Sequence, residues 1–576
     1  MDHLVAGGMS SGEISTAEPT AFPEKRDGSD DGEKAATQTK VQTAEKEASP
    51  VPSYDGFKLG IRGRVIFFTL AVLTLMVSLD GTSISVALPQ VAHELNGSAI
   101  EAFWTGTSFL LCSTVFQPGT ATLSNIFGRR LLIMISLVFF LAGAVVASLA
   151  HNFTVMLAGR CIQGIGGGGL AMLAEIVVTD LVPLRLRGNY YGILSAMYAM
   201  GSVLGPIVGG GFAQSVTWRW IFYINFPFIG VGAILITFFF RLATPTGSLE
   251  DKLSRIDYVG TVLFIGSLSS FLIPLSWGGV MYDWDTWRTL APLAIGAAGL
   301  SVFVVYERYV PEEPMIPQSV FQNRSAAIGF VSSGLQGMIL WCGLYYMPFY
   351  FEAVRGFSPL LTGVALFPDT FTIAPAAIVC GVLISKTSRY RWCLWVGWML
   401  ATLGYGIVCL IQVHTSTAGW ILLRIPGNIG MGMITAATVC TVQASATNKN
   451  LTVAVAMVVF FRAFGQAIGI AVGGVIFQNQ MRHHLMQYAD LAPSAGHLSK
   501  DAAAMVMVMK DMQEGPTKEH LKLAYTDSLR IIWAWMCALS GAGLAMSLFI
   551  EKYDLNQALV SELGLVDTRD DRIEEM

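Results

Sequence analysis

The feature of this sequence that most constrains its fold is an internal repeat whose two copies lie 264 residues apart. Arg160 in the first copy corresponds to Arg424 in the second. The other matched positions are Ile165, Gly166, Gly168, Gly201, Gly205, Gly209 and Gly210, which correspond to Ile429, Gly430, Gly432, Gly465, Gly469, Gly473 and Gly474. Because both copies lie in long apolar segments, the repeat predicts a duplicated unit of membrane helices, which is typical of secondary transporters.

Composition excludes several classes of protein. Of the 576 residues, 53% are hydrophobic and 13% are charged. Apolar segments longer than about 18 residues predict an all-α membrane protein with many spans. The net charge of -4 is small, and no cluster of Lys and Arg with interleaved aromatics marks a nucleic-acid surface. We therefore expect no nucleic-acid partner.

The sequence also offers little for catalysis or cofactor binding. All eight cysteines fall within apolar segments and are interpreted as packing residues. The chain has no Walker-type phosphate loop, so the driving energy is expected to come from an ion gradient. His483, His484 and the methionines of 505–512 fit an amphipathic surface helix better than a site for a soft metal. We expect no metal, no cofactor and no enzymatic activity.

Apolar runs of about 20 residues predict fourteen membrane-spanning helices. The expected spans are 65–89, 103–123, 131–150, 153–178, 189–212, 220–240, 257–276, 289–308, 326–348, 360–385, 392–413, 418–442, 452–477 and 529–550. Thirteen Lys or Arg residues then fall in short inner loops, and only Arg219, Arg288 and Arg355 fall in short outer loops. This asymmetry predicts that both termini are cytosolic. We expect the plasma membrane, with the vacuolar membrane as the alternative.

The repeat divides these spans into domains. It falls in spans four and five and again in twelve and thirteen, which predicts two six-helix bundles with two inserted helices between them. The expected domains are a disordered cytosolic tail at 1–57, an N-terminal bundle at 58–245, two inserted helices at 246–313, a C-terminal bundle at 314–552 with an external loop at 478–528, and a cytosolic tail at 553–576.

Asp80 and Arg160 are the main candidates for proton coupling. Asp80 interrupts an apolar first span, where a charge is costly and usually faces a cavity, pairs or carries protons. Counting 1.5 Å per residue places Asp80 roughly 22 Å from the cytosolic end of its helix and Arg160 roughly 10 Å from the external end of its own. In a hydrocarbon core about 30 Å thick, the two residues therefore lie at similar depths. We expect the two to meet at a water-accessible pocket between the bundles. A static ion pair that holds the helices in register is the alternative.

Three further charged residues lie inside apolar runs. Arg424 occupies the repeat position of Arg160, but no acidic residue of matching depth is evident as its partner. Glu175 is close enough to the inner surface to extend its side chain to water or to bond the following loop, and Asp369 is given a similar structural role. Arg424 is therefore only a candidate residue of the substrate cavity.

Glycines predict a tightly packed helix seam. Gly201, Gly205 and Gly209 form a smooth stripe along the fifth span, and Pro206 removes one helix hydrogen bond there. The copy keeps Gly465 and Gly469 but has Ile470 in place of the proline, so the two seams are not expected to bend alike. Aromatic residues that could contact a flat amphipathic solute are Trp104, Tyr198, Tyr345 and Tyr346, although an interfacial aromatic belt explains the last two equally well.

The chain resembles the major facilitator superfamily, and within it the fourteen-span drug:proton antiporters found among fungal multidrug and toxin efflux pumps. Five runs carry the resemblance: Leu79–Pro89 in the first helix, Arg160–Gly166 in the fourth, Gly201–Gly210 in the fifth, and Trp218–Pro227 and Phe461–Gly465 as marks of the fourteen-span branch. The resemblance covers about 65–550 and implies the major facilitator fold. It also implies that Gln163 belongs to the proton-transfer motif with Arg160.

One loop departs from the family pattern. In the run Ala121–Arg130 the family usually has Gly first, and it usually has Asp where this chain has Asn125. The resemblance assigns Asn125, Gly128, Arg129 and Arg130 to the cytosolic gate. Loss of the carboxylate puts the usual charge relay of that gate in doubt, although Asn can still accept a hydrogen bond.

We therefore expect a monomeric, proton-coupled exporter of amphipathic small molecules, such as drugs, toxins or secondary metabolites, that works by rocking of its two halves in the bilayer. A proton-symport importer, for example of siderophores, is the nearest alternative, because one fold hosts both directions. A membrane receptor that does not transport is a further alternative, which the co-occurrence of Asp80 and Arg160 disfavours.

Overall fold

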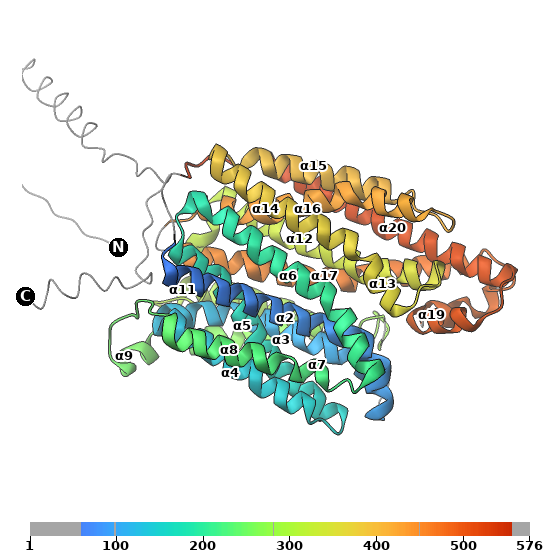
Figure 1. Cartoon of the computed structure of the whole chain (residues 1–576), viewed down its shortest axis with the longest axis horizontal. Helices are drawn as coiled ribbons and strands as arrows, with labels where there is room; N and C mark the ends of the chain where they lie inside the picture. Colours follow the sequence, from blue (N-terminus) through green and yellow to red (C-terminus); the bar gives the residue numbers. More distant parts are fainter. Residues whose placement is uncertain (1–58, 97–98, 280, 448–449, 501, 556–576) are drawn as a thin grey trace, which may run out of the picture. The chain divides into compact units, whose positions relative to one another are not determined.

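The computed structural model describes residues 59–96, 99–279, 281–447, 450–500 and 502–555. The tail expected at 1–57 lies outside the described residues, as does the part of the tail expected at 553–576 that follows Leu555. Within the described residues the fold is all-helical, with a single isolated bridge between Gly278 and Tyr282 (Figure 1). This confirms the predicted all-α class.

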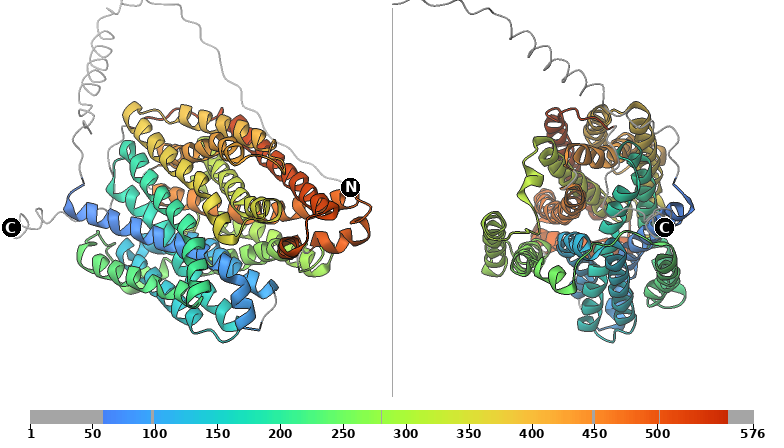
Figure 2. Two further views of the ribbon diagram at one scale, coloured as in Figure 1. Left: turned by 45° about the vertical axis from the view of Figure 1, so that its right-hand side comes forward. Right: turned by 90° about the vertical axis from the view of Figure 1, so that its left-hand side faces the viewer.

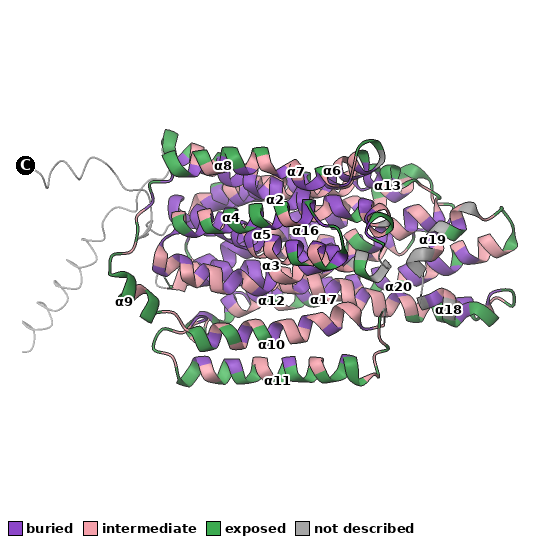
Figure 3. Cartoon of the chain, turned by 90° about the horizontal axis from the view of Figure 1, so that it is seen from below, coloured by how far each residue is buried: buried purple, intermediate pink, exposed green. Residues whose placement is uncertain are grey.

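Six helical segments form the N-terminal half. They are α2 (Ile61–Glu94), α3 (Ala99–Phe127), α4 (Arg129–Ser148), α5 (Phe153–Leu181), α6 (Leu184–Ser215) and a broken segment made of α7 (Trp220–Tyr223) and α8 (Asn225–Phe239). The short α9 (Leu249–Ser254) follows, and then α10 (Tyr258–Trp277) and α11 (Trp287–Tyr309). Helices α10 and α11 pack against each other along one edge of the bundle, where most of α11 is exposed (Figure 3).

The C-terminal half repeats this order with extra short helices. Its elements are η2 (Gln318–Phe321), α12 (Arg324–Phe349), η3 (Tyr350–Val354), α13 (Pro359–Ala365), α14 (Phe367–Thr387), α15 (Arg391–Val408), α16 (Thr417–Ser445), α17 (Leu451–Leu485), η5 (Ala492–Ser494), α18 (Ala495–Lys500), α19 (Ala502–Asp511) and α20 (Pro516–Ser547). The helices of the two halves run roughly parallel to one another (Figure 2).

Twelve helical segments in the described residues are long and apolar enough to cross a membrane. Fourteen spans were expected, and the other two correspond to α3 and α15. Helix α3 has 29 residues but is rich in Ser and Thr, and α15 has 18 residues and begins with Arg391. Both helices pack within the bundle, α3 against α5 and α15 against α16.

The internal repeat is visible in the helix boundaries. Helices α5 and α16 each have 29 residues and begin 264 positions apart, at Phe153 and Thr417. Their N-terminal caps are also equivalent. Asn152 accepts a hydrogen bond from the Val155 amide at 2.9 Å, and Ser416 accepts one from the Gly419 amide at 3.2 Å. Each side chain satisfies an amide that the first helical turn leaves without a partner.

The predicted glycine seams hold corresponding helix pairs together. A Cβ at Gly209 of α6 would lie 2.0 Å from the Ser83 carbonyl oxygen of α2. In the second copy, a Cβ at Gly465 of α17 would lie 2.0 Å from the Gly334 carbonyl oxygen of α12. Such distances exclude any side chain, so glycine is required for this close backbone approach.

The segment expected as an external loop at 478–528 is largely helical. Helix α17 continues to Leu485, and α20 begins at Pro516. Between them, Lys510 of α19 donates to Glu352 of η3 at 3.3 Å. This contact attaches the segment to η3 of the C-terminal half.

Candidate functional site

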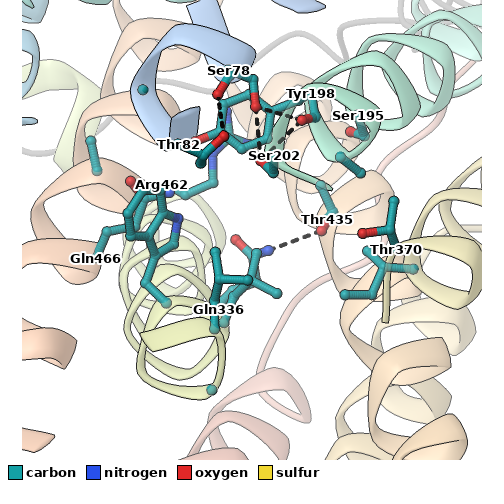
Figure 4. Close-up of a pocket in the computed structure, with 18 of the residues that line it drawn as sticks. Ser78, Thr82, Ser195, Tyr198, Ser202, Gln336, Thr370, Thr435, Arg462 and Gln466 are labelled. Carbon is teal, nitrogen blue, oxygen red and sulfur yellow. Dashed lines mark hydrogen bonds between the residues drawn. The ribbon is translucent and has the colours of Figure 1, made fainter. Parts of the chain in front are cut away.

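A cavity of about 220 Å³ lies between the two halves. Helices α2, α3, α5 and α6 supply one wall, and α12, α14, α15, α16, α17 and α20 supply the other. The walls carry many hydroxyl and amide groups. On one side Ser78 donates to the Tyr198 carbonyl oxygen and contacts Ser202, and on the other Gln336 donates to Thr435 (Figure 4). Such walls suit a solute that is partly polar.

Asp80 and Arg160 form an ion pair inside the N-terminal half. Arg160 Nη1 donates to Asp80 Oδ2 at 2.7 Å and to Gln163 Oε1 at 2.8 Å. Asp80 Oδ1 accepts from Gln163 Nε2 at 2.9 Å and from Asn225 Nδ2 at 2.7 Å. Arg160 Nε donates to the Thr105 carbonyl oxygen at 3.0 Å. The structure therefore brings the two predicted residues together with Gln163.

This pair is sealed from the cavity, which differs from the expected water-accessible position. The side chains of Asp80 and Arg160 are both 0% exposed. The Arg160 guanidinium carbon lies 4.4 Å from the centroid of the Phe109 ring, and Phe109 lines the cavity. The pair is thus separated from the cavity by the packing of α2, α3 and α5. Asn225 was not singled out, although it is a polar residue in an otherwise apolar run.

Arg424 has an acidic partner, which corrects the expectation from sequence. It donates to Asp369 and to the Ala365 carbonyl oxygen at 3.2 Å, while Asn428 donates to the other oxygen of Asp369 at 2.6 Å. Arg424, Asn428 and Asp369 all line the cavity. This ion pair forms because the first turn of α14 packs against α16. The depth of each residue along its own helix does not show which helices pack against each other.

Glu175 also has a partner that the sequence did not indicate. Its Oε1 accepts a hydrogen bond from Arg462 Nη2, which joins α5 of one half to α17 of the other. Both residues line the cavity. The expectation that Glu175 extends to the inner surface or bonds a following loop was therefore wrong.

The aromatic candidates are distributed more widely than expected. Tyr198 lines the cavity. Trp104 instead packs edge-on against Trp277 of α10, with ring centroids 6.3 Å apart. Tyr346 donates to the Ile470 carbonyl oxygen of α17 at 2.7 Å, and Tyr345 packs against it. The structure thus places Trp104, Tyr345 and Tyr346 in helix packing, outside the residues that line the cavity.

Arg129 joins the two halves at the end of the bundle that also carries Arg185 and Arg187, which we call the arginine-rich end. It donates to Asp180 at 3.0 Å, to Asn125 at 2.7 Å and to Thr452 of the C-terminal half at 2.9 Å. Asp180 thus supplies a carboxylate next to the position where the family pattern would place one, and Asn125 acts as a neutral acceptor.

The other residues assigned to this gate shape the turn before α4. Gly128 has a φ of 92°, a conformation that side-chain-bearing residues rarely adopt. Arg130 donates to the Thr237 carbonyl oxygen of α8 at 2.7 Å, and so holds α4 to its neighbour within the same half.

Further contacts close the arginine-rich end. Arg187 donates to Gln443 of α16 at 3.0 Å, and Gln443 donates to Tyr191 at 2.7 Å and to Thr179 at 3.3 Å. Thr179 and Gln443 are separated by 264 residues, so equivalent positions of the repeat touch each other here. Arg185 adds a bond of 2.8 Å from its Nε to the Ser385 carbonyl oxygen. The structure therefore represents a conformation closed at this end.

Asp180→Asn is expected to lower the thermal unfolding midpoint of the purified protein by several degrees. Arg129 is 1% exposed, and breaking a buried ion pair by removing one partner costs about 3 kcal/mol or more. Thermal unfolding in detergent measures the effect. Asn125→Ala is the control, because it removes only a neutral acceptor. Equal shifts in the two variants would contradict the assignment of Asp180 as the main partner.

Metal binding has no evident location in the described residues, which contain no group of three or more His, Cys, Asp or Glu side chains able to hold an ion.

Comparison with known proteins places the chain among transporters. The sequence profile of the Major Facilitator Superfamily matches residues 70–470. The MFS transporter L2 of Phoma sp. is 49% identical over 535 residues, which cover 93% of this chain and 90% of that protein. Efflux pump FUS6 of Gibberella moniliformis is 34% identical over 531 residues, covering 91% and 94%. The proton:xylose symporter XylE, at 15% identity, covers 86% of this chain and 97% of its own with a TM-score of 0.54, which supports the fold alone.

Proposed function

Because the chain belongs to the major facilitator superfamily, a family of multi-pass membrane transporters and not of enzymes, we propose that it exports amphipathic small molecules in exchange for protons. The relative named as an efflux pump supports export. A cavity that combines apolar, hydroxyl and amide groups supports a partly polar substrate such as a drug, a toxin or a secondary metabolite. No second chain is required by this scheme, and we propose a monomer.

Fourteen helices would then cross the membrane. Helices α3 and α15 pack beside the twelve apolar segments, and each occupies the position expected of a span in its half. The arginine-rich end would face the cytosol, because Lys and Arg favour inner loops. With that orientation, the contacts of Arg129, Arg185 and Arg187 close the cytosolic side of the cavity. We propose the plasma membrane as the location, with the vacuolar membrane as the alternative.

The buried ion pair of Asp80 and Arg160 is the observation that best supports proton coupling. A carboxylate in the membrane is costly unless it is paired, and it can gain or lose a proton when its partner or its access to water changes. Gln163 and Asn225 hold Asp80 in place at 2.9 and 2.7 Å. Rocking of the halves would move this cluster between a sealed state and one in contact with water. The glycine seams of α6 and α17 would keep the moving helices closely packed.

Export against an imposed pH gradient is the test of this function. In inside-out vesicles with an acidic lumen, the protein should accumulate fluorescent amphiphiles from a panel of neutral, cationic and anionic dyes. Collapse of the gradient with a protonophore should stop accumulation, because ATP is not the energy source. Vesicles that lack the protein are the control. Accumulation only with an alkaline lumen would instead support proton symport, which imports its solute when the cell exterior is the more acidic side. Absence of transport for the whole panel would contradict the proposal.

A further inference from the structure

The three carboxylates at the centre of the molecule differ in how completely they are hydrogen-bonded. Asp80 accepts bonds on both oxygens, and so does Asp369. Glu175 accepts a bond from Arg462 on Oε1, whereas its Oε2 is buried and accepts none. A buried acceptor without a donor is uncommon and costly. A proton on this oxygen would displace no existing donor.

Glu175 also differs from the other two carboxylates in its position between the halves. Asp80 pairs with Arg160 inside the N-terminal half, and Asp369 pairs with Arg424 inside the C-terminal half. The bond from Arg462 to Glu175 instead runs from α17 to α5 across the cavity. Rocking of one half against the other would leave the first two pairs intact and would separate Glu175 from Arg462.

We propose that Glu175 is a second proton-binding residue of the transport cycle, and that its protonation releases the ion pair with Arg462, which is one of the bonds between the two halves. The inference rests on the proposed proton-coupled function and extends it to this residue. A proton from water in the cavity binds Oε2, and the carboxylate becomes a neutral acid. Its attraction to the Arg462 guanidinium falls, and the arginine-rich end can open. The same proton leaves to water on the other side.

The surroundings of Glu175 are consistent with this step. Helix α6 contributes Tyr191, which donates to the Glu175 carbonyl oxygen at 3.0 Å, and Tyr198, which lines the same cavity. Helix α3 contributes Gln117, whose Oε1 is buried on the cavity wall without a donor. Arg462 is therefore the cation that holds the charged form of Glu175.

Hydrogen exchange followed by mass spectrometry tests the opening without a substrate. Glu175→Gln imitates the protonated acid and should raise exchange about tenfold in the peptides around 185–192 and 440–446, which close the arginine-rich end. Glu307→Gln is the matched control, because Glu307 of α11 is also a buried carboxylate with one oxygen lacking a donor. Glu307 accepts a hydrogen bond from the Ile316 amide and lies on α11 at the edge of the bundle (Figure 3), so this variant should leave those peptides unchanged. Wild-type exchange in Glu175→Gln would overturn the proposal.

Labelling with dicyclohexylcarbodiimide tests proton binding directly, because this apolar reagent modifies protonated carboxyl groups within membranes. At pH 5.5 Glu175 should be modified severalfold more than at pH 8, as measured by peptide mapping of the wild-type protein. Modification of Glu307 at pH 5.5 serves only to show that the reagent reaches buried carboxyl groups. Modification of Asp80 or Asp369 with none at Glu175 would overturn the proposal. Neither experiment requires transport. If no dye in the panel is transported, the proposed function is contradicted, whereas these two experiments still show whether Glu175 binds a proton and controls the opening.

Discussion

Asp80→Asn is expected to abolish gradient-driven export while the protein remains inserted in the membrane. The amide cannot carry the proton that the carboxylate would release, so transport loses its link to the pH gradient. The amide nitrogen would also face Arg160, Gln163 or Asn225, all of which donate to Asp80. Export of the dyes into inside-out vesicles, normalised to the amount of inserted protein, measures the effect.

A second measurement separates loss of coupling from loss of structure. Exchange of labelled for unlabelled dye at equal pH needs no net proton movement, so it should persist if Asp80 acts as the proton carrier. Removing one member of a buried pair costs about 3–5 kcal/mol, because the other charge is left without compensation. The double variant Asp80→Asn with Arg160→Gln removes both charges and should recover part of the thermal stability without recovering export. Unchanged export by Asp80→Asn would remove this residue from the mechanism.

Gly209→Ala is expected to disrupt the seam between α6 and α2 and to reduce export strongly. The new Cβ would lie 2.0 Å from the carbonyl oxygen of Ser83, so the helices must separate. Overpacking of this kind typically costs about 1–3 kcal/mol, and contact with backbone atoms leaves no flexible side chain to yield. The thermal unfolding midpoint in detergent and dye export in vesicles measure the two consequences.

Gly211→Ala is the matched control for this seam. Gly211 lies two residues further along α6, and a Cβ there meets nothing within 4 Å. It should therefore leave both stability and export near the wild-type level. Gly465→Ala, at the repeat position of Gly201, should behave like Gly209→Ala, because its Cβ would lie 2.0 Å from the Gly334 carbonyl oxygen. Normal stability and export in Gly209→Ala would show that the seam tolerates separation.

The repeat is the part of the fold that could be predicted most fully. Its spacing of 264 residues anticipated equivalent helices, and α5 and α16 have equal lengths and equivalent caps. The pairing of Asp80 with Arg160 was also predictable, because a charge in the membrane requires a partner and two residues of similar depth can supply one. The number of membrane-spanning helices was harder to predict, because α3 contains so much Ser and Thr that it is not a clearly apolar span.

The sequence by itself determined the class of protein, the duplication and the residues whose burial demands a partner, because these follow from hydrophobic length, periodicity and the cost of a charge in lipid. The tertiary structure decided which partners they take. Asp369 beside Arg424, and Glu175 beside Arg462, lie on helices whose rotation and packing are set by many contacts at once. Depth along a single helix contains no information on that rotation, and so the ion pair of Glu175 and Arg462 between the two halves became visible only in three dimensions.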